Sequence, residues 1–392
     1  MRSFYDSIFF NVPHLRFPEF TEEWKNTSLG KIGKTFNGLT GKSGSDFGQG
    51  FPYITYKSIF DNSKIDISRV EYVEITDVER KKETQNKVQY GDVFFTTSSE
   101  TPDEVGMSSV LLDEIKDCYL NSFCFGYRLN SLSKTVPEYM RFYLRSQTIR
   151  KKMFVLAQGS TRFNISKSEV MGMSINIPEI EEQRKIANLL TLLDDRIATQ
   201  NKIIERLETL IKGLRNEIFW KLRKNVGFNA MIGDVLDYEQ PQSYIVEDTE
   251  YIDKGTPVLT ANKAFILGYT SETEGIYDKG DCIIFDDFTL DSKYVDFPFK
   301  VKSSAIKILT AENKELLRYT FEFLKYLDLS TSEHKRHYIA ETQNQEFILP
   351  TTQIVRTIAH TFSILSLRME TAIKQRLLFE KQKQYLLRQM FI

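Results

Sequence analysis

Three charged residues of this 392-residue chain could together form a site that hydrolyses a phosphodiester bond. Asp103, Glu114 and Lys116 follow the loose carboxylate-and-lysine spacing of metal-dependent nucleases, in which two acids hold a magnesium ion. The same spacing recurs by chance in charged sequences, so solvated charges near a hairpin are the competing interpretation. A stand-alone nuclease built on these residues would cut DNA with magnesium and nothing else.

Two shorter patterns could bind phosphate or metal. Residues 41–43, Gly-Lys-Ser, resemble the end of a phosphate-binding loop, but Phe36 stands where such a loop needs its first glycine. His334 and His337 have no third ligand of the right type nearby, so no zinc site is predicted. The sequence also lacks a dinucleotide fingerprint and the Asn-Pro-Pro-aromatic run of adenine methyltransferases. It therefore predicts a binding protein without catalytic residues, cofactor or metal of its own.

Composition limits the class of protein. The net charge of −1 and the pI near 6.5 argue against a protein that coats nucleic acid through an all-round basic surface. Three cysteines, at positions 118, 124 and 282, neither pair evenly nor fall at metal-ligand spacing, which favours a reducing cytoplasm. Neither a signal-peptide core nor an apolar run long enough to cross a bilayer is found, so we expect no membrane association.

Local charge is more informative than net charge. Residues 140–168 carry seven lysines and arginines and not one acid. This stretch is a candidate phosphate-facing surface, and a solvated helix face is the alternative interpretation.

An internal repeat organises the chain, because two similar segments each begin at a proline. A shift of 172 residues aligns Pro178 with Pro350 without a gap. The same shift aligns further pairs along the segments: Arg184 with Arg356, Ile186 with Ile358, Ala187 with Ala359, Leu193 with Leu365, Leu214 with Leu386 and Phe219 with Phe391. Upstream the similarity is fainter and the offset drifts, with residues 29–32, 51–54 and 91–95 corresponding to residues 232–235, 256–259 and 280–284.

Each repeated segment is predicted to be a long helix. In the first, apolar residues from Ile186 to Ile218 recur in steps of four and three, the pattern of a coiled coil, with Gln200 as the one polar slot. In the second, Arg376 and Lys383 occupy two slots of the stripe. We expect the two helices to pair antiparallel as a spacer between two globular heads; a solvent-exposed tether or a dimerisation rod is the alternative.

The domain order is therefore head, helix, head, helix, with boundaries at residues 1–178, 179–222, 223–349 and 350–392. The heads are expected to be α/β or α+β units. Strands are predicted at residues 88–97, 119–129 and 306–309, and helices at residues 137–156 and 312–327. Residues 38–50 are rich in glycine and serine, which predicts a mobile loop.

This arrangement resembles the specificity subunits of type I restriction-modification systems. The resemblance covers the whole chain, and its most specific parts are residues 159–190 (GSTRFNISKSEVMGMSINIPEIEEQRKIANLL), residues 12–20 (VPHLRFPEF) and residues 24–33. The end of the second head, HKRHYIAETQNQEFILP, matches the corresponding stretch of the first only loosely.

The resemblance implies two target-recognition domains that each read one half of a bipartite, asymmetric site in double-stranded DNA. It implies that the two helices dock methyltransferase subunits, two of them, and that two restriction subunits complete the assembly. These partners would use S-adenosylmethionine, ATP and magnesium for adenine methylation and cleavage. A coiled-coil adaptor without DNA readout is the alternative from another class.

Polar and aromatic residues near predicted strand ends and loops are the candidates for DNA contact, because base edges are distinguished by paired donors and acceptors. In the first head they are Lys42, Tyr53, Tyr56, Lys57, Thr97, Ser98, Arg150, Lys151, Ser160, Thr161, Arg162 and Asn164. In the second head they are Thr260, Asn262, Lys263, Lys335, Arg336 and Tyr338.

Overall fold

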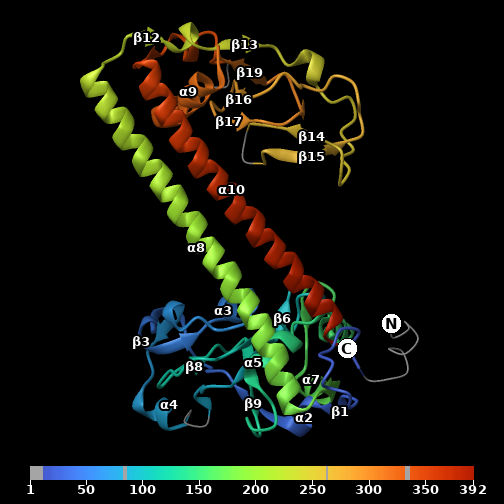
Figure 1. The fold of residues 1–392 in the computed structure, drawn as a ribbon. Helices are drawn as coiled ribbons and strands as arrows, with labels where there is room; N and C mark the ends of the chain where they lie inside the picture. The colour runs from blue at the N-terminus through green and yellow to red at the C-terminus, as the bar shows by residue number, and fades with distance from the viewer. Residues whose placement is uncertain (1–11, 83–85, 262–263, 332–335) are drawn as a thin grey trace. The chain divides into compact units, whose positions relative to one another are not determined.

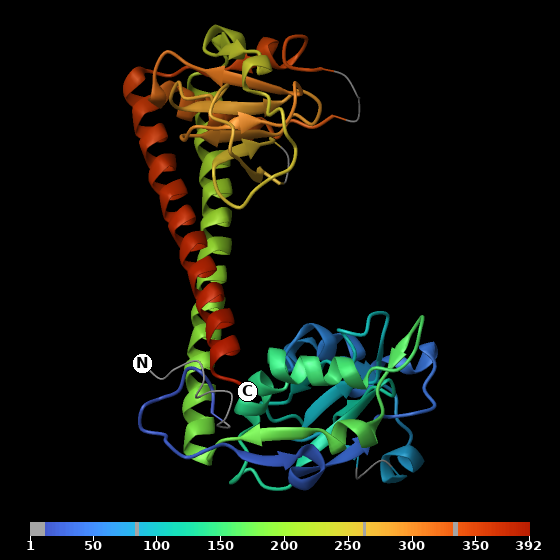
Figure 2. The same ribbon diagram turned by 90° about the vertical axis from the view of Figure 1, so that its right-hand side faces the viewer.

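The computed structural model describes residues 12–82, 86–261, 264–331 and 336–392 (Figures 1 and 2). The chain divides into two compact units. The first unit comprises residues 1–199 and 376–392, and the second comprises residues 200–375. Each unit contains one globular head and one end of each of two long helices, α8 (Ile180–Asn225) and α10 (Thr352–Gln389).

The first head is built on a four-stranded antiparallel sheet and a smaller three-stranded sheet. The larger sheet has the order β2 (Gly33–Asn37), β9 (Cys124–Leu129), β5 (Val93–Thr96), β7 (Ser108–Val110). The smaller has the order β4 (Glu71–Val73), β3 (Phe47–Ile54), β8 (Tyr119–Leu120), with β3 and β8 parallel. Two-stranded ribbons pair β1 (Lys25–Ser28) with β11 (Ser174–Ile177) and β6 (Ser98–Ser99) with β10 (Phe163–Asn164).

Short helices connect these strands. They are α2 (Leu29–Ile32), α3 (Tyr56–Asp61), α4 (Asp77–Lys82), α5 (Pro137–Tyr143), α6 (Gln147–Leu156) and α7 (Lys167–Gly172), with 3-10 turns η1 (Gly44–Asp46) and η2 (Ile67–Arg69).

The central strand β5 explains why the first head has two covered faces. All four of its side chains are buried, and successive side chains of a strand point to opposite faces. Val93 and Phe95 belong to the core that includes α5 and the long helices. Phe94 belongs to a second core with Ile54 and Leu120. Because both faces of this strand are buried, its sequence is a continuous run of mostly apolar residues rather than an alternation of apolar and polar ones.

The second head repeats the topology of the first. Its larger sheet has the order β13 (Asp237–Glu239), β19 (Ile306–Thr310), β16 (Cys282–Asp286), β17 (Ser292–Val295). Its smaller sheet has the order β15 (Ile266–Thr270), β14 (Thr256–Leu259), β18 (Lys300–Val301), with β14 and β18 parallel. The remaining elements are the ribbon of β12 (Ala230–Met231) with β20 (Glu346–Phe347), helix α9 (Lys314–Leu327) and the turns η4 (Ile232–Asp234), η5 (Gln242–Tyr244) and η6 (Thr342–Asn344).

The faint sequence similarity between the heads corresponds to matching elements. A Cβ placed on Gly30 would lie 3.1 Å from the carbonyl oxygen of Met171, and one on Gly233 would lie 3.1 Å from that of Gln343. Gly91 and Gly280, which precede the central strands β5 and β16, both have positive φ, at 85° and 93°. The internal repeat therefore includes the heads as well as the helices.

In each unit the two long helices pack against each other and against the head. In the first unit, Ile186 and Leu190 near the start of α8 share a core with Leu386 near the end of α10. In the second unit, Ile211 and Phe219 towards the end of α8 share a core with residues of the start of α10: Val355, Ile358 and Phe362. Since the start of one helix meets the end of the other, the pair is antiparallel, as the heptad pattern predicted.

A phenylalanine from the end of each helix is inserted into the adjoining head. The Phe391 ring lies 5.7 Å from the rings of both Tyr139 and Tyr143 on α5. The Phe219 ring lies 5.4 Å from the rings of both Tyr319 and Phe323 on α9. These contacts explain why the 172-residue register holds as far as these two phenylalanines.

Two local predictions differ from the structure. Residues 137–156 form two helices, because Ser146 takes an extended conformation (ψ 153°) and its side chain accepts a hydrogen bond from Ile149 N at the start of α6. Residues 38–50 are only partly a loop, because β3 begins at Phe47. Gly41, Gly48 and Gly50 have positive φ in this segment, which a glycine adopts without strain.

Candidate nucleic-acid interface

Three neighbouring segments of the first head bring several of the predicted residues together. Thr97 N donates a hydrogen bond to the carbonyl oxygen of Phe123 at 3.1 Å, and Ile165 N donates to the carbonyl oxygen of Thr97 at 3.0 Å. Strands β6 and β10 continue this pairing, with Asn164 opposite Ser98. We call Thr97, Ser98, Ser99, Arg162 and Asn164 the β6–β10 surface; the sequence predicted four of its five members without knowing that they meet.

Arg162 is the exposed cation of this surface. Its Nε donates to Ser98 Oγ at 3.2 Å, and Asn164 Nδ2 donates to its carbonyl oxygen at 3.3 Å. A Cβ on Gly159, whose φ is 136°, would lie 2.2 Å from that same carbonyl oxygen, so the tight loop requires glycine there. Glu169, the acid that could have paired with Arg162, instead accepts a hydrogen bond from Gln158 at 2.8 Å. The loop therefore presents an exposed guanidinium that is held by the Ser98 hydroxyl group.

Tyrosine and threonine side chains support the β6–β10 surface from behind. The Tyr56 hydroxyl donates to the carbonyl oxygen of Ser98 at 2.6 Å, and burial raises the pKa of this tyrosine. Thr97 Oγ1 donates to the carbonyl oxygen of Phe123 at 2.8 Å. Ser99 Oγ donates to Glu104 at 3.2 Å. The hydrogen bonds of Tyr56 and Thr97 hold backbone in place, and that of Ser99 joins two side chains. Of the β6–β10 surface, Arg162 and Asn164 are the exposed members.

The other predicted residues of this region are exposed. Ser160 and Thr161 lie in the loop before Arg162, and Lys151 lies on α6. Lys57 lies on α3, with its side chain 88 % exposed and its Nζ 3.8 Å from Asp61.

Several basic residues of the stretch 140–168 stabilise the fold by donating hydrogen bonds to backbone carbonyl groups and do not form an exposed surface. The guanidinium of Arg145 donates to four backbone carbonyl groups, those of Ser108, Ile59, Phe60 and Asn62, and burial lowers its pKa to about 10.

Arg150 donates to the carbonyl groups of Asp103, Val105 and Gly106, and Lys152 to that of Ser174. The expected continuous phosphate-facing surface is therefore reduced to the few cations that remain exposed. The sequence could not reveal this, since the accepting carbonyl groups lie on distant segments.

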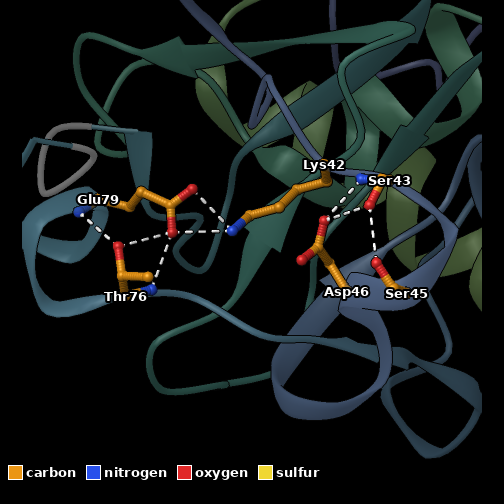
Figure 3. Close-up of polar contacts among 6 residues, drawn as sticks. All are labelled: Lys42, Ser43, Ser45, Asp46, Thr76 and Glu79. Atoms are coloured by element: carbon orange, nitrogen blue, oxygen red, sulfur yellow. Dashed lines mark hydrogen bonds and ion pairs between the residues drawn. The ribbon is translucent and has the colours of Figure 1, made fainter.

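Lys42 holds a loop rather than facing solvent. Its side chain is only 8 % exposed, and its Nζ lies 2.7 and 2.8 Å from the two carboxylate oxygens of Glu79, as Figure 3 shows. Glu79 also accepts a hydrogen bond from Thr76 N at 2.8 Å at the start of α4. Nearby, Ser43 N donates to Asp46 at 2.7 Å. The ion pair thus ties the glycine-rich segment to α4.

Two predicted aromatic residues lie in the core. Tyr53 is 3 % exposed, with its ring 5.4 Å from that of Phe47, and burial raises its pKa to about 12. Tyr338 is fully buried, with its ring 5.4 Å from that of Phe285. A DNA base could reach either ring only if the core opened, so the structure gives both tyrosines a packing role.

In the second head, the described candidates include one residue that corresponds to the β6–β10 surface. Arg336 is exposed, and its Nη2 donates to Ser304 Oγ at 3.4 Å. The next residue, His337, donates its N–H to the carbonyl oxygen of Asp287 at 3.0 Å, as Ile165 does to Thr97 in the first head. Thr260 is 8 % exposed. Asn262, Lys263 and Lys335 lie outside the described residues.

The nuclease pattern is not assembled. The carbonyl oxygen of Asp103 binds Arg150, and within the described ranges no group of three or more His, Cys, Asp or Glu residues could hold a metal ion. The three cysteines are buried and unpaired, and burial raises the pKa of Cys118 to about 12. Over the same ranges, no helix combines the length and the apolar character that a membrane crossing requires.

The family model for the type I restriction modification DNA specificity domain matches residues 21–209, which comprise the first head from Thr21 onwards and α8 as far as Thr209. These residues carry the DNA specificity domain of type I restriction-modification systems. The family resemblance seen in the sequence is thereby confirmed.

Individual members of the specificity-subunit family match parts of the chain. The chain is 43 % identical over 151 residues to the type I restriction enzyme EcoR124I/EcoR124II specificity subunit of Escherichia coli, a match covering 37 % of this chain and 35 % of that protein. It is 26 % identical over 230 residues to the MjaIX specificity subunit of Methanocaldococcus jannaschii, covering 58 % and 50 %. These matches span half of each relative's length or less.

A specificity subunit of known structure has the same fold. The crystal structure of the S subunit of a type I restriction-modification system from M. genitalium matches with a TM-score of 0.68 at 14 % identity. The match covers 97 % of this chain and 99 % of that one. Two α/β heads with two long helices, the fold class predicted from the sequence, are confirmed.

Sequence reasoning missed one exposed residue beside the β6–β10 surface. Phe123 is 60 % exposed and lies between β8 and β9, inside the stretch predicted as one continuous strand. The Asn-Ser pair at residues 121–122 was the available signal, because both residue types favour turns.

Proposed function

We propose that this chain is the DNA-sequence-reading subunit of a type I restriction-modification complex. Each head reads one half of a bipartite, asymmetric site in double-stranded DNA, and partner subunits perform adenine methylation and cleavage. The observation that carries the proposal is the β6–β10 surface, where an exposed arginine is held beside hydroxyl and amide groups on a strand-supported loop. Such groups match the donors and acceptors that base edges display in the major groove.

The chain performs no chemistry itself in this proposal. Support comes from the described residues, where the acids of the nuclease pattern do not form a metal-holding group. S-adenosylmethionine, ATP and magnesium act in the partners, which are two methyltransferase subunits and two restriction subunits in the cytoplasm. The two antiparallel helix ends in each unit offer the partners a continuous helical surface with exposed apolar residues such as Leu192 and Leu367.

The two heads are proposed to read different bases with related geometry. Equivalent backbone hydrogen bonds run from Ile165 to Thr97 and from His337 to Asp287. Arg162 lies three residues before the first donor, and Arg336 lies one residue before the second. Their surroundings differ, because Asp287 replaces a neutral residue in the second head. Different donor and acceptor sets on a shared frame are what an asymmetric target requires.

The methylation pattern of cells that carry the complete system tests this proposal. Sequencing methylated adenines should give one motif with two specified halves and an unspecified spacer, and the motif should vanish when this chain is deleted. Methylation that persists without the chain, or a motif with one uninterrupted half, would contradict the proposal.

A further inference from the structure

Phe123 is an exposed aromatic residue whose neighbours along the chain are either buried or polar. Its side chain is 60 % exposed, whereas Leu120 and Cys124 on either side are 1 % and 2 % exposed. An exposed phenylalanine costs hydration free energy unless something covers it. The turn between β8 and β9 therefore presents one isolated apolar group to whatever approaches the β6–β10 surface.

The backbone of Phe123 is fixed on both sides. Its N–H donates to Asn121 Oδ1 at 2.7 Å. Its carbonyl oxygen accepts two hydrogen bonds from Thr97, from N at 3.1 Å and from Oγ1 at 2.8 Å. Asn121 is itself anchored, because its N–H donates to the carbonyl oxygen of Ile54 at 3.0 Å. Only the two side-chain torsions of Phe123 stay free, so the ring is pre-positioned for contact.

Phe123 and Arg162 are held by two consecutive residues of one segment. Thr97 N donates a hydrogen bond to the carbonyl oxygen of Phe123, and Ser98 Oγ accepts the hydrogen bond from Arg162. The exposed ring and the exposed guanidinium therefore belong to the same part of the first head.

The chemistry of the neighbours indicates DNA rather than protein as the partner of this ring. Protein interfaces need a contiguous apolar core, but Ser122, which precedes Phe123, and the two hydrogen-bond partners of Phe123, Asn121 and Thr97, are all polar. A single apolar group among donors and acceptors instead matches the major groove, where the C5-methyl group of thymine is the apolar feature of a base edge.

We propose that Phe123 is a specificity-determining residue that contacts the C5-methyl group of a thymine in the half-site read by the first head. The inference rests on the proposed function and adds to it a base-contacting residue and the base it favours. No covalent step is involved.

The test uses the complex assembled with its methyltransferase subunits. The DNA duplexes contain the sequence that this complex methylates. Each thymine of the first half-site is replaced in turn by deoxyuridine, which removes only the methyl group. Burial of one such group favours the thymine duplex by about fourfold in affinity. Wild-type complex should lose about that factor at one position, while Phe123→Ala should bind more weakly and show no further loss there.

Two variants serve as controls. Phe123→Leu keeps an apolar side chain and should retain part of the discrimination between thymine and deoxyuridine. Leu132→Ala removes another exposed apolar side chain, 44 % exposed, that packs near Gly91 before β5, at the opposite end of that strand from Thr97. It should bind like the wild type. Melting temperatures identify any variant that fails to fold, in which case Phe123→Leu decides the question.

Several results would overturn the inference. They are an unchanged affinity of Phe123→Ala, an equal loss on deoxyuridine substitution in wild type and variant, and a first half-site without thymine. A variant that weakens target and random duplexes alike would also reject the methyl contact. Failure of the proposed function looks different, because the wild-type complex itself would then not distinguish target from random duplex.

Discussion

The side chain of Arg162 is held by Ser98, whose Oγ accepts a hydrogen bond from Nε at 3.2 Å. One contact through Nε orients the planar guanidinium and leaves its outer edge with the two donors that fit guanine O6 and N7. Ser98 lies directly after the buried strand β5 and its adjoining residue Thr97. A residue next to the buried strand of the first head thereby positions an exposed cation.

Arg162→Ala should weaken binding of target DNA by the complex assembled with methyltransferase subunits, and leave that assembly and the melting temperature unchanged. A base contact contributes about 1–3 kcal/mol and is lost only on target duplex, whereas a phosphate contact is lost on all duplexes and lowers the salt slope by about one unit. Affinities at two salt concentrations separate these outcomes. A lower melting temperature with preserved affinity would instead mean that Arg162 merely orders its loop.

The ion pair of Lys42 and Glu79 should make the stability of the first head depend on pH. The hydrogen bond from Lys42, followed by those from Thr76, lowers the pKa of Glu79 to about 2 from an ordinary 4.5. A lowered folded-state pKa stabilises the fold above the unfolded-state pKa, and this contribution is lost as pH falls through the folded-state value. The stability advantage of wild type over Glu79→Gln should therefore be constant above about pH 5 and shrink from pH 4.5 downwards.

Urea unfolding of wild type and Glu79→Gln at pH 7, 5, 4 and 3 measures this difference. Lys42→Met should be destabilised at pH 7, because it leaves the Glu79 carboxylate without its cation. Lys57→Met removes an exposed lysine 3.8 Å from Asp61 and should change stability by less than about 0.5 kcal/mol. A difference between wild type and Glu79→Gln that does not vary with pH would contradict this account.

Phe391 should be one of the most sensitive positions of the first unit. It is 4 % exposed and packed against Tyr139 and Tyr143, so Phe391→Ala should lower the free energy of unfolding by about 3–5 kcal/mol through lost burial and a cavity. Leu378→Ala, on α10 shortly before Phe391 but at a side chain that is 64 % exposed, is the control and should have little effect. Equal melting temperatures for the two variants would mean that the aromatic contact is not stabilising.

The sequence predicted what depends on local periodicity and on repetition. The steps of four and three between apolar residues from Ile186 onwards were sufficient to predict a long helix. One of the two basic residues in the apolar stripe of the second helix is now explained, since Lys383 forms an ion pair with Asp194. Residue type alone did not predict burial. Arg145 and Arg150 are both arginines of a basic stretch, yet each holds carbonyl groups of segments far away in the chain.

The residues of the candidate site could be predicted from the sequence, but their contacts with distant segments could not. Arg162 and Asn164 could be singled out because they lie in a basic stretch and their side chains can contact phosphates and base edges. That they would meet Ser98 depends on the pairing of β6 with β10, which local sequence does not determine. Tyr338 was singled out beside basic residues, but its ring fills the space next to Phe285.

Exchange of one head tests the central claim most directly. Residues 1–175 are replaced by the equivalent segment of a related specificity subunit, and methylated adenines are sequenced in cells that carry the complete system. The account predicts a new sequence in one half of the methylated motif, with the other half unchanged, because each head reads its own half-site. A change in both halves together, or in neither, would contradict the claim that the two heads read DNA independently.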